Sequence, residues 1–158
     1  MVDRVLKDSG VDPASLELEF TESVIMEQAD KTIETLQALK KMGIQLSIDN
    51  FGTGYSSLNY LKHFPIDRIK IDRSFVADLD HSNDDATLVE TIISMGHSLN
   101  RKVLAEGVEN GKQLNFLTAA GCDEVQGFYL AMPMTAEDIA KRIRRTHGKR
   151  AGALPLSI

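Results

Sequence analysis

The sequence has no tryptophan and only one cysteine, Cys122, among its 158 residues. One cysteine cannot form an intrachain disulfide, so a disulfide-stapled secreted fold is excluded and Cys122 is interpreted as a small buried hydrophobe. No apolar stretch approaches the roughly 20 residues that a membrane-spanning helix needs. The N-terminal stretch MVDRVLKDSG also lacks the apolar core of a signal peptide. We therefore expect a cytoplasmic protein without a membrane partner.

An excess of positive charge is also missing. The formal net charge is −5 at pH 7, which argues against a nucleic acid polymer as the main partner, because nonspecific binding of phosphates depends on clustered Lys and Arg. The chain does have the composition of a globular protein, with 42% hydrophobic and 26% charged residues. Its length suits one domain of about 100 to 200 residues.

Short apolar runs alternate with amphipathic stretches. Five runs have the length of a β-strand: LELEF at 16–20, IQLSID at 44–49, RIKID at 68–72, KVLAEG at 102–107 and EVQGFY at 124–129. Apolar spacing predicts helices at 29–43, 83–100, 110–122 and 134–145. The predicted apolar faces are Ile33, Leu36, Leu39 and Met42 in the first helix, and Leu88, Ile92, Met95 and Leu99 in the second. This alternation predicts an α/β fold of βαβ units with a parallel sheet.

Each predicted strand delivers an oxygen-bearing side chain at or near its carboxyl end. These residues are Glu19, Asp49, Asp72, Glu106 and Gln126. Because the parallel strands of a (β/α) barrel all end at one mouth, where active sites are built, we expect these side chains to share a site. Taken singly, each acid has an equally good explanation as a helix N-cap or a surface turn.

The alternation of side chains along a strand divides polar from apolar positions. In RIKID, Lys70 and Asp72 share one face, and Ile69 and Ile71 share the other. A lysine among acids is either an ion-pair partner or, where bound cations lower its pKa, a proton acceptor. Both interpretations of Lys70 remain open. The same alternation puts Glu17 on the face of Glu19.

Four longer segments resemble a known family. The segments are LELEFTES, SIDNFGTGYSSLNYLKHFPIDRIKIDRSF, LAEGVEN and CDEVQGFYLAMPM. They closely resemble the EAL-domain family of cyclic-di-GMP phosphodiesterases and follow one another in the family's order. The resemblance extends from about residue 11 to about residue 143. The resemblance implies a TIM-type (β/α) barrel that hydrolyses cyclic-di-GMP to linear pGpG. It also implies two Mg²⁺ or Mn²⁺ ions, which suit oxygen ligands and a phosphodiester substrate.

The resemblance further implies residue roles. The catalytic set is Lys70, Glu106 and Gln126, and the metal-binding set is Glu19, Asp49, Asn50 and Asp72. Asp49 would bridge both ions, and Lys70 would orient or deprotonate the attacking water near Gln126. Glu22 would stabilise a flexible loop that consists of Phe51, Gly52, Thr53, Gly54, Tyr55, Ser56 and Ser57.

Two departures from the family pattern reduce the expected activity. Asn50 stands where the family usually has a second Asp, and an amide brings no charge to the second ion. The Glu-Ala-Leu motif and an early metal-binding Asn are also missing. We therefore expect a barrel truncated to about five C-terminal βα units, against the eight of a complete barrel. Residues 1–145 would form this partial domain and 146–158 a C-terminal tail, with at most one weakly bound divalent ion.

Three hypotheses about function remain. The chain is a cyclic-di-GMP phosphodiesterase that is weak or inactive by itself, a degenerate module that binds cyclic-di-GMP or a protein partner without hydrolysis, or a truncated fold without a ligand. A five-unit piece of a barrel would leave two open sheet edges, and open edges are templates for pairing with another chain. We therefore expect a homodimer that forms through these edges.

Overall fold

A parallel sheet forms the centre of the structure, a computed structural model that describes residues 2–26, 29–53, 61–80 and 82–147. Its five strands lie in the order of the sequence: β1 (Glu17–Thr21), β2 (Gln45–Phe51), β3 (Arg68–Ile71), β4 (Lys102–Ala105) and β5 (Glu124–Val125). The predicted parallel α/β fold is confirmed. Strand β5 is shorter than predicted, because the chain turns away from the sheet after residue 126.

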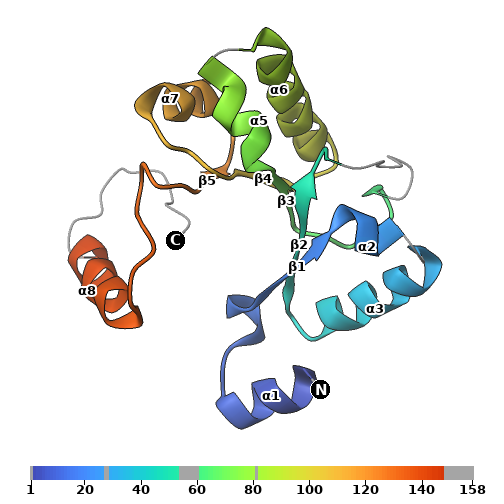
Figure 1. Ribbon diagram of the computed structural model, residues 1–158. Coiled ribbons are helices and arrows are strands. Elements are labelled where there is room, and N and C mark those ends of the chain that lie inside the picture. Colours follow the sequence, from blue (N-terminus) through green and yellow to red (C-terminus); the bar gives the residue numbers. More distant parts are fainter. Residues whose placement is uncertain (1, 27–28, 54–60, 81, 148–158) are drawn as a thin grey trace.

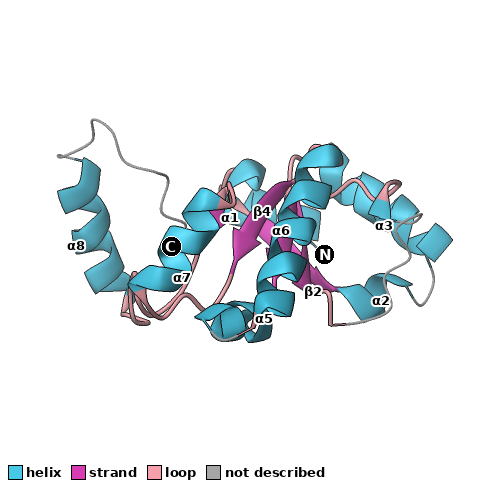
Figure 2. Cartoon of the chain, turned by 90° about the horizontal axis from the view of Figure 1, so that it is seen from above, coloured by secondary structure: helices cyan, strands magenta, loops and turns pink. Residues whose placement is uncertain are grey.

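Helices follow the strands and form an arc around the sheet (Figure 1). The four predicted helices correspond to α3 (Ala29–Lys41), α6 (Asn83–Ser98), α7 (Gly111–Ala119) and α8 (Ala136–His147). Figure 2 shows α3 and α8 at opposite ends of the molecule. Sequence analysis missed the shorter α1 (Val2–Ser9), α2 (Glu22–Met26) and α5 (Arg73–Ala77), and the 3-10 turns η1 (Pro13–Ser15) and η2 (Asp78–Asp80). None of the helices in the described ranges has the length and hydropathy needed to cross a membrane.

The apolar face of the sheet packs against the helices and forms the core. Its buried strand residues are Leu46, Ile48, Ile69, Ile71, Val103 and Ala105. Helix α3 contributes Leu36 to this core, with Ile33, Leu39 and Met42 partly buried around it, as predicted. Burial of these apolar side chains, at about 25 cal/mol per Å² of area removed from water, is the main stabilising term of the fold.

The buried face of α6 differs in part from the prediction. Of the predicted face, Ile92 is buried and Met95 and Leu99 are partly buried against the core, whereas Leu88 is exposed. Val89, Ile93 and Gly96 are buried as well. The reason is the close approach of α6 to β4 at Gly96, where an added Cβ would lie only 2.4 Å from Val103 Cγ2. Only a glycine allows this approach, which goes with burial of the helix side that carries Val89, Ile93 and Gly96.

Candidate functional site

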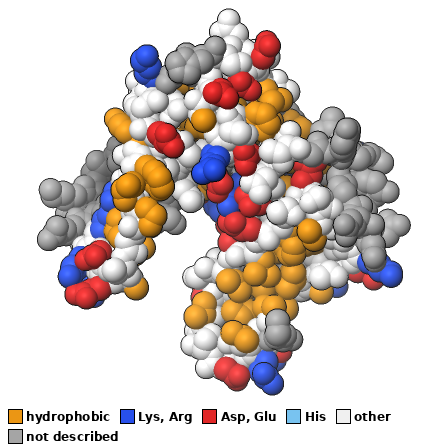
Figure 3. Space-filling view, in the orientation of Figure 1, with side chains coloured by type: hydrophobic (Ala, Val, Ile, Leu, Met, Phe, Trp, Pro, Cys, Tyr) orange, Lys and Arg blue, Asp and Glu red, His pale blue; other side chains and the backbone are white. Residues whose placement is uncertain are grey.

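Charged side chains gather on the other face of the sheet. Figure 3 shows acidic and basic side chains around a hollow between two apolar areas. The centre of the candidate site is the Lys70 cluster, which we define as Lys70, Glu19, Asp49 and Glu106. Lys70 Nζ lies 2.7 Å from Glu19 Oε2, 2.8 Å from Glu106 Oε1 and 3.4 Å from Asp49 Oδ1. All five strand-end residues were predicted to share a site, and the structure brings three of them to Lys70.

The strands explain why these side chains converge. Glu19 belongs to β1, Asp49 to β2 and Lys70 to β3, and Glu106 directly follows β4. The backbone N–H of Glu106 donates to the Ile71 carbonyl at 3.2 Å, which continues the pairing of β3 and β4 by one residue. All four side chains therefore lie at the carboxyl ends of neighbouring parallel strands, the position at which barrel enzymes bind their substrates.

The carboxylates determine the protonation state of Lys70. Burial alone lowers the pKa of Lys70, but hydrogen bonds to Glu106 and Glu19 and the charges of Glu106 and Asp49 outweigh it and raise the pKa well above its usual value. In this arrangement Lys70 is therefore an ammonium that donates hydrogen bonds and accepts no proton. With three carboxylates around one ammonium, the Lys70 cluster has an excess of negative charge.

A bulge shapes the end of β2. The pairing of β2 with β3 is irregular between Ile48 and Phe51, and Asn50 has a φ of 54°, a left-handed conformation that asparagine tolerates better than most residues. Such bulges commonly re-aim a side chain next to a functional site. The Asn50 carbonyl accepts hydrogen bonds from the N–H and Oγ1 of Thr53, at 3.4 and 2.8 Å, and so begins the following loop.

The fit of a metal ion depends on the free oxygens of the cluster. Within the described part of the chain, no three Asp, Glu, His or Cys side chains are grouped closely enough to hold a metal, because the carboxylates turn toward Lys70. However, Asp49 Oδ1 is buried and accepts no hydrogen bond from the described residues, since Lys70 approaches it without hydrogen-bond geometry. This oxygen, which accepts no hydrogen bond, and the excess of negative charge fit one hard divalent cation that competes with the ammonium.

Asp72 lies outside the Lys70 cluster. Its Oδ1 accepts hydrogen bonds from the backbone N–H of Ser74 at 2.8 Å and from Ser74 Oγ at 2.5 Å, so that it caps the N-terminus of α5. This is the alternative explanation of an acid at a strand end. The predicted role of Asp72 in metal binding therefore has no support from the observed contacts.

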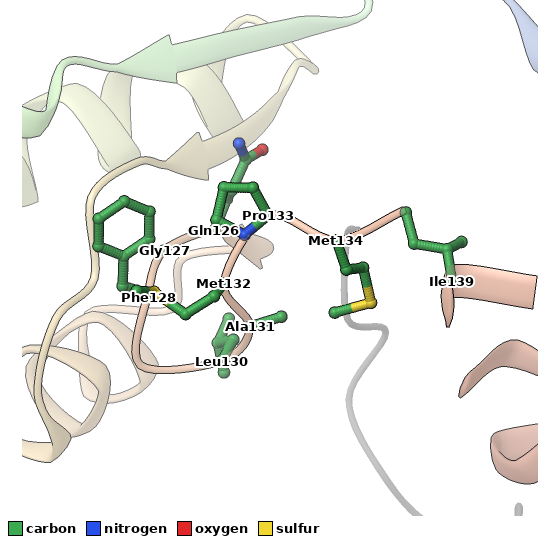
Figure 4. A pocket seen from close by; sticks show the side chains of 9 residues that line it. All are labelled: Gln126, Gly127, Phe128, Leu130, Ala131, Met132, Pro133, Met134 and Ile139. Atoms are coloured by element: carbon green, nitrogen blue, oxygen red, sulfur yellow. The ribbon is translucent and has the colours of Figure 1, made fainter. Parts of the chain in front are cut away.

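Gln126 lies just beyond β5 and is exposed. It lines a pocket of about 300 Å³ together with Gly127, Phe128, Leu130, Ala131, Met132, Pro133, Met134 and Ile139. Figure 4 shows its amide beside Pro133, whereas Met134 and Ile139 form the far side. Gln126 is thus the polar residue of an otherwise apolar pocket, and its predicted place near the attacking water stays a prediction.

Glu22 is buried at the start of α2, with 5% of its surface exposed. Its Oε2 accepts a hydrogen bond from the Gly52 N–H at 3.3 Å, which links α2 to the beginning of the predicted flexible loop. Gly52 has a φ of 95°, and an added Cβ would lie 3.0 Å from the Phe75 ring. Phe51 is buried and Thr53 is exposed. The remaining predicted loop residues, Gly54, Tyr55, Ser56 and Ser57, lie outside the described residues.

Sequence analysis missed a second group of charges on the same face. Arg68 pairs through Nη1 with Glu17 Oε2 and through Nη2 with Glu124 Oε2, the latter at 2.8 Å. Lys102 Nζ lies 3.4 Å from Glu124 Oε1 and is the more exposed partner. The signal was available, because alternation already placed Glu17 on the face of Glu19.

Comparison with known proteins decides the family. The EAL domain family model matches residues 1–133. The chain belongs to the EAL domain family. This match also includes α1, although the motifs alone suggested a beginning near residue 11. A relative from Pseudomonas aeruginosa, the bifunctional diguanylate cyclase/cyclic di-GMP phosphodiesterase MucR, is 50% identical over 129 residues, which are 82% of this chain and 19% of MucR.

Solved EAL structures confirm the fold class. The structure of the MucR phosphodiesterase in complex with c-di-GMP matches this EAL domain with a TM-score of 0.85 and 48% identity, over 87% of this chain and 56% of the solved chain. A manganese and c-di-GMP complex of BlrP1 from Klebsiella pneumoniae matches with a TM-score of 0.74 and 33% identity, over 80% of this chain and 32% of the solved chain. The chain thus spans about a fifth of full-length MucR and little more than half of its solved phosphodiesterase, which fits a partial barrel.

Proposed function

We propose that this EAL domain binds cyclic-di-GMP and that its complete form hydrolyses the cyclic dinucleotide to linear pGpG. The observation that carries the proposal is the Lys70 cluster at the carboxyl ends of the parallel strands, in a chain that is similar to the c-di-GMP complex of MucR. A buried ammonium surrounded by more acids than it can neutralise is a typical arrangement of a functional site.

Each residue of the cluster has a proposed task. Glu19 and Asp49 supply oxygen ligands for one Mg²⁺ or Mn²⁺ ion, which when bound would stabilise charge on the phosphodiester oxygens. Lys70, as an ammonium, donates hydrogen bonds and orients water or phosphate oxygens. Glu106 keeps Lys70 in place, and Gln126 interacts with the ligand at the edge of the apolar pocket.

Catalysis by the 158 residues alone is expected to be slow or absent. Asn50 contributes an amide where a carboxylate would bind a second ion. The Lys70 cluster contains three carboxylates and one ammonium. Two divalent cations in one site would need more negative charge than this cluster supplies to offset their mutual repulsion. The alternative function, binding of cyclic-di-GMP or of a protein partner without hydrolysis, is favoured by the same deficit.

Calorimetric titration with cyclic-di-GMP, in Mn²⁺ and in EDTA, tests the proposal. We expect binding that is stronger in Mn²⁺, and chromatography of the mixture should show little linear product. Glu19→Gln should weaken binding in Mn²⁺, whereas Glu34→Gln, a change on α3 outside the cluster, should not. Absence of binding under both conditions would reject the proposal, and rapid formation of pGpG would show that the truncated site is complete enough for catalysis.

A homodimer is the proposed assembly. Strands β1 and β5 lie at the two edges of the described sheet, and no strand in the described ranges pairs with their outer sides. Unpaired backbone groups at such edges favour pairing with a second copy. Light scattering at micromolar concentration should therefore give twice the mass of the chain. A monomer that is well folded at this concentration would reject the dimer.

A further inference from the structure

Arg68 connects the two edge strands of the sheet across its charged face. It belongs to the central strand β3, whereas its partners Glu17 and Glu124 belong to β1 and β5. In a flat sheet, strands separated by four spacings of about 4.8 Å would lie about 19 Å apart. One guanidinium that contacts acids from both edges therefore requires a strongly curled sheet.

The geometry of arginine suits this connection. Nη1 pairs with Glu17 and Nη2 with Glu124, so each terminal nitrogen serves one edge, while Nε is buried without a partner among the described residues. The planar fork of a guanidinium can donate to two acids at once, whereas an ammonium is a single point of charge. Glu124 is buried, with 6% of its surface exposed, so its carboxylate has little access to water.

Each member of this group lies two residues before a predicted site residue on the same strand face. Glu17 precedes Glu19, Arg68 precedes Lys70, and Glu124 precedes Gln126. Alternate residues of a strand lie on one face, roughly 7 Å apart. A change in the separation of Glu17 and Glu124 should therefore also move Glu19 on β1 and Gln126 just beyond β5.

We propose that Arg68, bridging Glu17 and Glu124, is a positioning residue that sets the width of the site between β1 and β5. The Arg68 bridge, as we call these three residues, touches no ligand in this proposal. It acts through the curvature of the sheet, and the importance of that width for ligand binding rests on the proposed function.

A distance measurement tests the bridge without any ligand. Spin labels are attached to Val24→Cys on α2 and Tyr129→Cys beyond β5, both exposed positions, in a Cys122→Ala background. Double electron–electron resonance should give a longer and broader distance distribution for Arg68→Met than for the parent. Arg68→Lys keeps the charge but lacks the two terminal nitrogens that serve Glu17 and Glu124 separately, so it should give an intermediate result. An unchanged distribution for Arg68→Met would overturn the proposal.

Lys40→Met is the matched control, because it also removes a cation from a partly buried pair. Lys40 Nζ contacts both oxygens of Asp67, at 2.8 and 2.7 Å, but connects α3 with the start of β3 instead of the two edges. It should lower stability without changing the distance. An equal shift in Lys40→Met would show that the distance reports only general loosening, and would overturn the proposal.

A neutralised variant separates positioning from charge balance. Combining Arg68→Met with Glu17→Gln and Glu124→Gln neutralises the two acids that lose Arg68 as a partner, so stability should recover while the distance stays long. This variant also carries the test if Arg68→Met alone does not fold. Recovery of the parental distance would overturn the proposal, because the bridge would then only neutralise charge.

Manganese affinity connects the bridge with the site. Widening should lower the Mn²⁺ affinity of Arg68→Met about tenfold or more, as is typical when residues that orient ligands are lost, and Lys40→Met should retain the parental affinity. A longer distance with unchanged affinity would overturn the positioning role. If the parent chain binds no Mn²⁺, the metal part of the proposed function fails, and the distance measurement still decides the role of Arg68 in setting the width.

Discussion

Lys70 Nζ lies 2.7 Å from Glu19 Oε2, although β2 separates their two strands. Two strands that flank a third would lie about 10 Å apart in a flat sheet, so the contact depends on curvature and on two long side chains. On β2, Ser47 is in register with Glu19 on one side and with Arg68 on the other. Ser47 is fully buried in this position, and its Oγ has no hydrogen-bond partner among the described residues.

Replacement of Lys70 by an uncharged residue should increase the thermal stabilisation of the chain by Mn²⁺. Lys70→Met leaves Glu19, Asp49 and Glu106 without their shared partner, which should lower the free energy of unfolding by about 2 kcal/mol, less than for a fully buried pair because the acids are partly exposed. Mn²⁺ should then raise Tm more in the variant than in the parent, since the ion no longer competes with the ammonium. Equal Tm shifts in both proteins would contradict competition for the same carboxylates.

Restoring an acid at position 50 should improve metal binding but not catalysis. Asp tolerates the left-handed φ of Asn50, so Asn50→Asp should add a carboxylate without backbone strain. We expect tighter Mn²⁺ binding and hydrolysis that stays near background. Asn100→Asp is a matched control, because Asn100 has a φ of 55° but lies between α6 and β4, at the other end of the sheet. Substantial hydrolysis by Asn50→Asp alone would mean that position 50, and not truncation, limits activity.

The turn after β5 should not tolerate a side chain at Gly127. A Cβ there would lie 2.2 Å from the Val108 carbonyl oxygen and 2.3 Å from its nitrogen, so Gly127→Ala should cost about 3 kcal/mol and displace the lining of the apolar pocket. Gly121→Ala meets open space and should cost only about 1 kcal/mol for its left-handed conformation. Urea denaturation compares the two variants, and equal losses would contradict the close approach.

The thiol of Cys122 should couple stability to alkaline pH. Burial raises the pKa of this thiol from 9.0 to about 11, although backbone hydrogen bonds oppose the shift. The folded chain keeps a proton that the unfolded chain loses, so stability should fall as pH rises from about 9 to about 11. Cys122→Ser should lack this part of the decline. Titration by thermal melting measures the difference, and identical pH profiles would contradict the shift.

Much of the fold was predictable because strands and long helices have clear apolar periods. The five strands and the helices α3, α6, α7 and α8 were found in this way. Helices α2 and α5, with five residues each, are too short to show a period. The exposure of Leu88 and the burial of Gly96 on α6 were missed because they depend on the contact of Gly96 with β4, which no pattern within the helix reveals.

The candidate site was predictable only in part. A strand-end acid looks the same in sequence whether it faces the mouth, as Asp49 does, or caps the next helix, as Asp72 does. The choice depends on how far the strand continues before the chain turns, and therefore on tertiary packing. The Arg68 bridge escaped detection for a similar reason, because its members lie far apart in the sequence and meet only when the sheet curls.

The charged inner face has a consequence for an incomplete barrel. An apolar sheet face that is exposed to water would promote aggregation. The ion pairs of Lys70 and Arg68, in contrast, can be hydrated without losing their partners. A partial barrel with such a charged face can therefore expose it to water without aggregating. In the proposed dimer, association would then be directed by backbone groups at the two edges, and higher salt should loosen the curvature of the sheet while leaving the helix-covered core intact.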